Sequence, residues 1–174
     1  MIAKPAADEF APFYTGYIEK VPLSGPLATL EAQRSAIQAL AALPDDKAAH
    51  RYAEGKWSVK ELLGHVADAE RVFGYRLLRI ARNDSTPLAG FDENAWALVA
   101  PHHQRPIGDI VKELLAVREA TLALIQSMDA DALARQTVAN TRPVSGRALV
   151  WILAGHCQHH LGILSERYGV APAA

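Results

Sequence analysis

The sequence has a single cysteine, Cys157, among its 174 residues. One cysteine excludes an internal disulfide and any CxxC metal or redox motif. The sequence also lacks an apolar run of about 20 residues, the length needed to cross a bilayer. Residues 1–13 contain charged residues and prolines and no apolar stretch typical of a signal peptide. We therefore expect a cytoplasmic protein that does not associate with membranes.

Clusters of positive charge are absent as well. The formal net charge is −1 at pH 7 and no run of Lys and Arg occurs, so nucleic acid is not an expected partner. Glycine-rich phosphate-binding motifs and the GxSxG motif of serine hydrolases are also missing. What is abundant is alanine, in a composition that is half hydrophobic, which favours a helical globular protein.

Four segments have the apolar periodicity of long amphipathic helices. They cover residues 26–43, 58–83, 107–128 and 145–169. Ser58 and Glu61 have the spacing of a capping box, and Ser145 and Gly169 are a plausible N-cap and C-terminal residue. Four such helices in a chain of this length predict an all-α four-helix bundle.

The rest of the chain is expected to form connections within the same domain, residues 1–174. Short extra helices are predicted at 92–100 and 129–133, and residues 136–144 are interpreted as a connector into the last long helix. Residues 1–23 contain several aromatic residues and prolines, and we expect an irregular arm that packs on the bundle.

Two histidines on the last helix are the first candidates for chemistry. His156 and His160 lie four residues apart, which places them about 40° apart around the helix and one turn apart along it. The apolar residues of this helix centre on the same direction, so both imidazoles are expected to face the interior. Such a pair can chelate one metal ion, or it can be two hydrogen-bonded core residues. The spacing leaves both interpretations open.

A third histidine, His65, lies roughly 80° from the middle of the apolar stripe of the second long helix. This border position suits the rim of a cleft and makes His65 the natural third ligand, although a surface histidine often occupies such a position. His102 and His103 are rival ligands, but their proline-flanked loop favours two surface residues.

Two carboxylates are candidates for a supporting role. Asp68 and Asp92 can each orient a ligating imidazole or act as a base beside a metal-bound water. Each also has an ordinary explanation, since Asp68 is expected on a solvated helix face and Asp92 suits the N-cap of a short helix.

Three segments in this order resemble the DinB-like superfamily of small metal-binding four-helix proteins. They are KWSVKELLGHVADAE (residues 56–70), GFDENAW (90–96) and AGHCQHHLG (154–162). The resemblance implies a divalent metal ion, zinc or nickel, bound by three histidines and one or more waters. Matched by position, these ligands are His65, His156 and His160. The superfamily includes bacillithiol transferases and a mycothiol-dependent maleylpyruvate isomerase, and dimers are common in it, so a homodimer is expected.

Two functions follow as hypotheses. The first is a metal-dependent enzyme that transfers a low-molecular-weight thiol to a small electrophilic substrate or hydrolyses that substrate. The alternative is a non-catalytic helical bundle, stabilised by the metal, that acts as a binding or stress-response protein.

Overall fold

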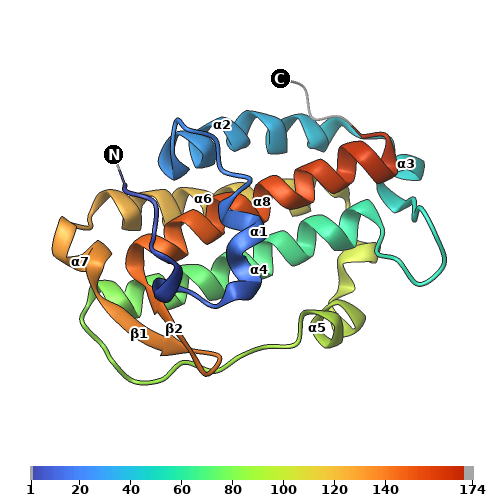
Figure 1. Cartoon of the computed structure of the whole chain (residues 1–174). Coiled ribbons are helices and arrows are strands. Elements are labelled where there is room, and N and C mark those ends of the chain that lie inside the picture. The colour runs from blue at the N-terminus through green and yellow to red at the C-terminus, as the bar shows by residue number, and fades with distance from the viewer. Residues whose placement is uncertain (1, 171–174) are drawn as a thin grey trace.

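The computed structural model describes residues 2–170; residue 1 and residues 171–174, at the ends of the expected domain, lie outside it. Four long helices lie side by side (Figure 1). They are α2 (Pro26–Ala39), α4 (Val59–Ala81), α6 (Ile107–Gln126) and α8 (Gly146–Tyr168). The predicted four-helix bundle is therefore confirmed. Within the described residues, no helix has both the length and the apolarity required to cross a bilayer.

Each long helix packs against two others, in the cyclic order α2, α6, α4, α8. Figure 1 shows α2 and α8 running in one direction and α4 and α6 in the other. Because α4 and α6 are parallel, residues 82–106 return along the length of the bundle between them. This long connection passes beside the site described below and contributes residues to it.

Shorter helices, of which η denotes 3-10 helices, occupy the connections. They are η1 (Ala7–Glu9), η2 (Pro12–Tyr14), α1 (Thr15–Ile18), η3 (Leu40–Ala42), α3 (Asp45–Ala49), α5 (Glu93–Val99), η4 (Pro101–Gln104) and α7 (Ala130–Ala134). The short helices expected near 92–100 and 129–133 thus correspond to α5 and α7.

The predicted helix caps are present. The Ser58 hydroxyl accepts a hydrogen bond from the backbone N–H of Glu61, whose carboxylate accepts one from the backbone N–H of Ser58 at 2.6 Å. At the start of α8, the Ser145 hydroxyl accepts from the N–H of Ala148 at 3.0 Å. Gly169 ends the helix with φ 64°, the left-handed conformation that glycine adopts without strain.

The connector expected at residues 136–144 forms a β-hairpin, which was not predicted from the sequence. Strands β1 (Gln136–Ala139) and β2 (Arg142–Ser145) pair antiparallel, with Ala139 opposite Arg142. Asn140 and Thr141 form the two-residue turn with φ of 48° and 65°. Turns of this kind are usually marked by glycine, and the Asn-Thr pair lacks that mark. The backbone of Leu88 bonds to Val138 and Asn140, which attaches the long connection to the hairpin.

The N-terminal segment is bound to the start of α8. The buried carboxylate of Glu9 accepts hydrogen bonds from Nε and Nη2 of Arg147 and from the Ser145 hydroxyl, all at 2.6 Å. Further along, α1 packs on α8. These contacts bring the aromatic residues of the segment next to the middle of α8.

A buried ion pair connects the long helices through the core. The guanidinium of Arg118 donates two hydrogen bonds to the Glu70 carboxylate, at 2.7 and 2.8 Å. It also donates to the carbonyl of Leu30 and to the side chain of Gln33, whose amide donates to the carbonyl of Ala154. Residues of α2, α4, α6 and α8 are thus joined in one network.

Candidate metal centre

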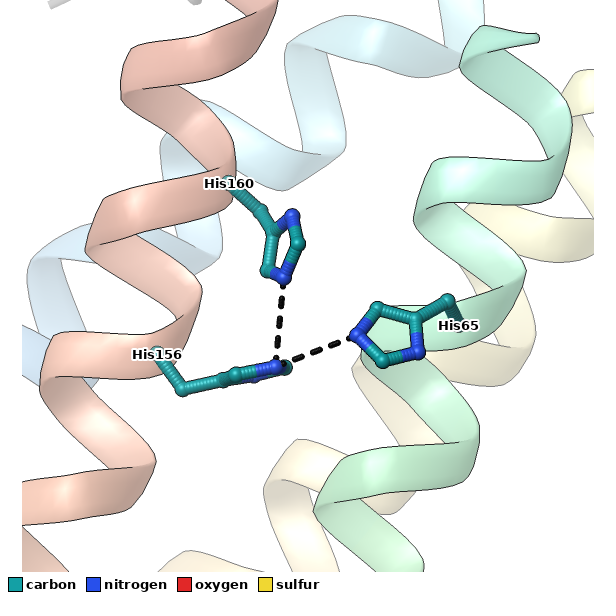
Figure 2. A group of neighbouring side chains, drawn as sticks. All are labelled: His65, His156 and His160. Atoms are coloured by element: carbon teal, nitrogen blue, oxygen red, sulfur yellow. Dashed lines mark hydrogen bonds between the residues drawn. The ribbon is translucent and has the colours of Figure 1, made fainter. Parts of the chain in front are cut away.

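Three histidines meet where α4 packs against α8. His65 comes from α4, and His156 and His160 come from successive turns of α8. Their rings point toward one another (Figure 2), and Nε2 of His156 lies 3.2 Å from Nε2 of each of the other two. The three residues are only 9%, 5% and 8% exposed. The structure therefore brings together the three histidines singled out from the sequence.

The arrangement of the nitrogens suits a cation. A neutral imidazole nitrogen can donate or accept one hydrogen bond in the ring plane, yet Nε2 of His156 has two nitrogen neighbours at 3.2 Å. Hydrogen bonding therefore satisfies at most one of these two contacts. Nitrogens about 2.0–2.1 Å from a tetrahedral zinc ion lie roughly 3.3 Å apart, close to the separation seen here. One ligand nitrogen from each histidine lies within 4.8 Å of the others, and the group can hold one metal ion.

The protonation state also suits metal binding. Burial lowers the pKa of His65 to about 4 and that of His160 to about 3, because an imidazolium would lose its hydration. The negative charges of Glu93 and Asp68 act in the opposite direction on the pKa of His65, but burial dominates. Burial also places the pKa of His156 well below its usual value. All three rings are therefore neutral at pH 7, with lone pairs available to a metal.

Aromatic rings surround the histidines. The ring centroid of Trp57 lies 4.8 Å from that of His65, and those of Tyr17 and Phe73 lie 5.4 and 5.6 Å from that of His156. The Tyr17 and Phe73 contacts are edge-to-face, which is a favourable geometry for aromatic pairs. These contacts restrict the orientation of the imidazoles.

A cavity of about 450 Å³ opens beside His65 and His156. Its walls come from the N-terminal segment, α4, the long connection, the hairpin and α8. The residues that matter for its chemistry are Tyr14, Tyr17, Phe73, Arg76, Phe91 and Glu93. The volume lies within the range of small-molecule sites, and the histidine cluster forms part of the wall.

Residues 28–164 match the family model of the DinB superfamily. The chain belongs to this superfamily. A protein of Oceanobacillus iheyensis with the provisional name of metal-dependent hydrolase is 29% identical over 121 residues, which span 68% of this chain and 69% of the relative. The resemblance stated from the three sequence segments is thereby confirmed.

Solved structures share the fold of this DinB-superfamily chain. YfiT from Bacillus subtilis, described as a probable metal-dependent hydrolase with an unusual four-helix bundle topology, aligns with a TM-score of 0.68 at 19% identity, covering 97% of this chain and 95% of YfiT. A mycothiol-dependent maleylpyruvate isomerase aligns with a TM-score of 0.66 at 16% identity, covering 88% and 64% of the two chains. The DinB-like protein YjoA from Bacillus subtilis aligns with a TM-score of 0.57 at 22% identity, covering 80% and 85%.

The two carboxylates proposed from the sequence lie in different surroundings. Asp92 is exposed and is the N-cap of α5, where its Oδ1 accepts hydrogen bonds from the N–H groups of Asn94 and Ala95 at 3.0 Å. Asp68 lies closer to the site, in the wall of a small hollow that also contains His65. Neither carboxylate lines the 450 Å³ cavity.

His102, expected at the surface, is only 6% exposed. Its Nε2 lies 3.3 Å from a carboxylate oxygen of Asp68. The imidazole occupies the space that a side chain at Gly64 would fill, since a Cβ there would lie 2.3 Å from the ring. The burial of His102, which belongs to η4, thus depends on the absence of a side chain at Gly64 of α4. His103 is exposed, as expected.

Three residues of the DinB-superfamily site were not identified from the sequence. Glu93 directly follows the helix cap Asp92, and its carboxylate lines the cavity. Arg76 lies 11 residues after His65, which places it about 20° from His65 on the same helix face. This spacing is a sequence signal that could have identified Arg76 as a site residue. Tyr17 reaches the site only because α1 packs on α8, and no local pattern indicates that contact.

Proposed function

We propose that this protein is a metal-dependent enzyme in which His65, His156 and His160 bind one divalent cation at the wall of the cavity. The observation that carries the proposal is the convergence of three buried, neutral imidazoles next to space for a small molecule, with Nε2 of His156 3.2 Å from Nε2 of each of the other two. Three protein ligands with a further position left for water or substrate are typical of catalytic metal sites.

The reaction is hydrolysis of a small electrophilic substrate, or transfer of a low-molecular-weight thiol to it. A bound zinc or nickel ion would lower the pKa of a water or thiol and so supply a nucleophile near neutral pH. The name of the Oceanobacillus iheyensis relative supports hydrolysis. The fold shared with the mycothiol-dependent isomerase supports the thiol alternative.

Glu93 is the residue best placed to accept a proton. Glu93 lines the cavity together with His65 and His156, and its negative charge acts to raise the pKa of His65. Tyr17 lines the same wall, and burial together with nearby Tyr14 and Glu93 raises the pKa of its phenol. The Tyr17 hydroxyl therefore stays protonated at neutral pH and can donate a hydrogen bond to a bound molecule.

Other expectations stay predictions. The cavity suits a small-molecule substrate. The homodimer, the cytoplasmic location and the supporting roles of Asp68 and Asp92 rest on the sequence arguments alone.

Metal content tests the ligand set. Protein purified without added ions should contain about one divalent ion per chain by elemental analysis, and His65→Ala, His156→Ala and His160→Ala should each lose most of it. His159→Ala is the matched control on α8, because this neighbouring histidine lies outside the cluster, and it should keep the ion. Equal metal content in all four variants would contradict the assignment.

Metal removal separates a catalytic from a structural ion. A chelator-treated sample is compared with a zinc-reconstituted one by circular dichroism and by assays of ester hydrolysis and of thiol addition to an electrophile. A retained fold with lost activity supports the enzyme. A lost fold, with no activity when zinc is present, supports the non-catalytic bundle stabilised by metal.

A further inference from the structure

Arg76 brings a buried positive charge to the cavity wall. Its side chain belongs to α4, is only 3% exposed and lines the same cavity as His65 and His156. Among residues 2–170, no carboxylate lies within ion-pair distance of its guanidinium. Nη2 of Arg76 donates a hydrogen bond to the backbone carbonyl of Ala89 at 2.7 Å.

The other deeply buried arginine is different. Arg118 donates two hydrogen bonds to the carboxylate of Glu70, so its charge is compensated within the protein. A buried cation without a carboxylate partner is costly, and an anion bound in the cavity would offset that cost. The planar guanidinium is also the side chain whose donor pattern best matches a carboxylate.

Arg76 and the histidine cluster share a neighbouring aromatic residue, Phe73. Its Cζ lies 5.9 Å from the ring centroids of Phe73 and Phe91. The ring of Phe73 lies in turn 5.6 Å from that of His156. The guanidinium and the ring of His156 therefore both lie next to Phe73, and a small molecule lying along Phe73 can contact both.

The other charged residues at the cavity limit the charge that a bound small molecule can carry. Arg142 is exposed where it lines the cavity, and it adds a second positive charge. Glu93 lines the cavity too and would repel a dianion. A cavity lined by one buried guanidinium without a carboxylate partner, one separate carboxylate and two phenylalanine rings suits a singly charged organic anion with an apolar body.

We propose that Arg76 binds the carboxylate of a small monocarboxylate substrate whose reacting group lies beside His65 and His156. This inference rests on the proposed function, because it names the substrate class of the same cavity. Arg76 is then a specificity residue, which selects acids over their neutral analogues.

Binding of benzoate and benzamide to the protein as purified tests the proposal, and the same titration is repeated after removal of the metal. The two probes have the same ring and differ in charge, and removal of the metal excludes binding through the ion. Chemical-shift titration should show at least about tenfold weaker benzoate binding in Arg76→Gln than in the parent, with no change for benzamide. Arg82→Gln removes the same charge from an exposed residue at the end of α4, and should change the affinity for benzoate less than twofold.

Equal benzoate affinity in the parent and Arg76→Gln would overturn the proposal, and so would equal affinity of the parent for benzoate and benzamide. Benzoate binding that requires zinc but not Arg76 would overturn it and leave the metal site intact. Loss of metal binding in the histidine variants is measured separately, so the two proposals can fail independently.

The parent protein gives a second readout if Arg76→Gln does not fold. The Nε–H resonance of Arg76 should shift on addition of benzoate and stay in place with benzamide. Arg76→Lys, which keeps a cation, should retain part of the benzoate affinity. Inorganic phosphate is the competing anion, and we expect it to displace benzoate weakly. Tighter Arg76-dependent binding of phosphate than of benzoate would overturn the assignment to a carboxylate.

Discussion

A methyl group added to Gly155 would lie 1.9 Å from the backbone carbonyl oxygen of Tyr17. The missing side chain therefore allows the backbone of α1 to lie directly on α8. At the next position in α8, the ring of His156 meets the ring of Tyr17 edge-to-face, with centroids 5.4 Å apart. This close contact of two helices places one wall of the cavity beside the histidine cluster.

Gly155→Ala should destabilise the protein by about 2–3 kcal/mol, because the added methyl group meets backbone that cannot rotate away. Gly162→Ala is the matched control on the same helix, since within residues 2–170 no heavy atom beyond the adjoining residues and helix backbone lies within 4 Å of the added Cβ. Gly162→Ala should stabilise the protein by up to about 1 kcal/mol, the usual gain when alanine replaces glycine inside a helix. Urea unfolding of the parent and the two variants measures both changes in the free energy of unfolding. Equal midpoints in both variants would contradict the close contact.

Local patterns were sufficient for the long helices and for the histidine pair. Ser58 and Ser145 mark helix starts by side-chain chemistry that acts over three residues. The convergence of His156 and His160 follows from helix geometry alone. The border position of His65 is also that of many surface histidines, and the resemblance to the DinB-like superfamily is what grouped it with the pair.

The cavity walls could not be derived in this way. Their residues come from segments far apart in the chain, and the direction of α6 decides where the long connection runs. Thr141 adopts a left-handed conformation that β-branched residues rarely take, so the hairpin had no recognisable signal. His102 is buried because Gly64, on another helix, leaves space for its ring. Contacts of this kind are properties of the packed structure.

The Arg118–Glu70 pair should be the most sensitive polar contact of the core. Glu70→Gln leaves the Arg118 guanidinium buried without its counterion, and we expect a loss of about 3–5 kcal/mol in the free energy of unfolding. Glu31→Gln is the control, because Glu31 pairs with Arg34 on the exposed face of α2 and such pairs contribute little. Chemical denaturation measures both. A small loss in Glu70→Gln would show that the pair contributes far less than its burial suggests.

The stability of the metal-free protein should depend on pH through the histidine cluster. The folded-state pKa values of His65 and His160, about 4 and about 3, lie below the unfolded value of about 6.5. At pH values between the folded-state and unfolded-state pKa, the unfolded chain binds more protons than the folded protein. The free energy of unfolding therefore decreases as the pH falls below about 6.5. We expect a loss on the order of a few kcal/mol between pH 7 and pH 4.5.

Urea unfolding of chelator-treated protein at several pH values measures this slope. His65→Gln should make the slope shallower, because one buried histidine no longer titrates. His103→Gln changes an exposed histidine outside the cluster, and this control should retain the slope of the parent. A pH-independent midpoint above pH 4.5 would show that the cluster accepts protons in the folded state.

Glu93→Gln tests the proton acceptor. If Glu93 is the base, kcat for the hydrolysis or thiol-transfer reaction should fall about 10²- to 10⁴-fold, while the metal content stays that of the parent. Asp109→Asn removes an equal charge from an exposed residue of α6 that does not line the cavity, and it serves as the control. Asp92→Ser retains a helix-capping side chain. A large loss of activity in Asp92→Ser together with a small one in Glu93→Gln would move the role of base from Glu93 back to Asp92.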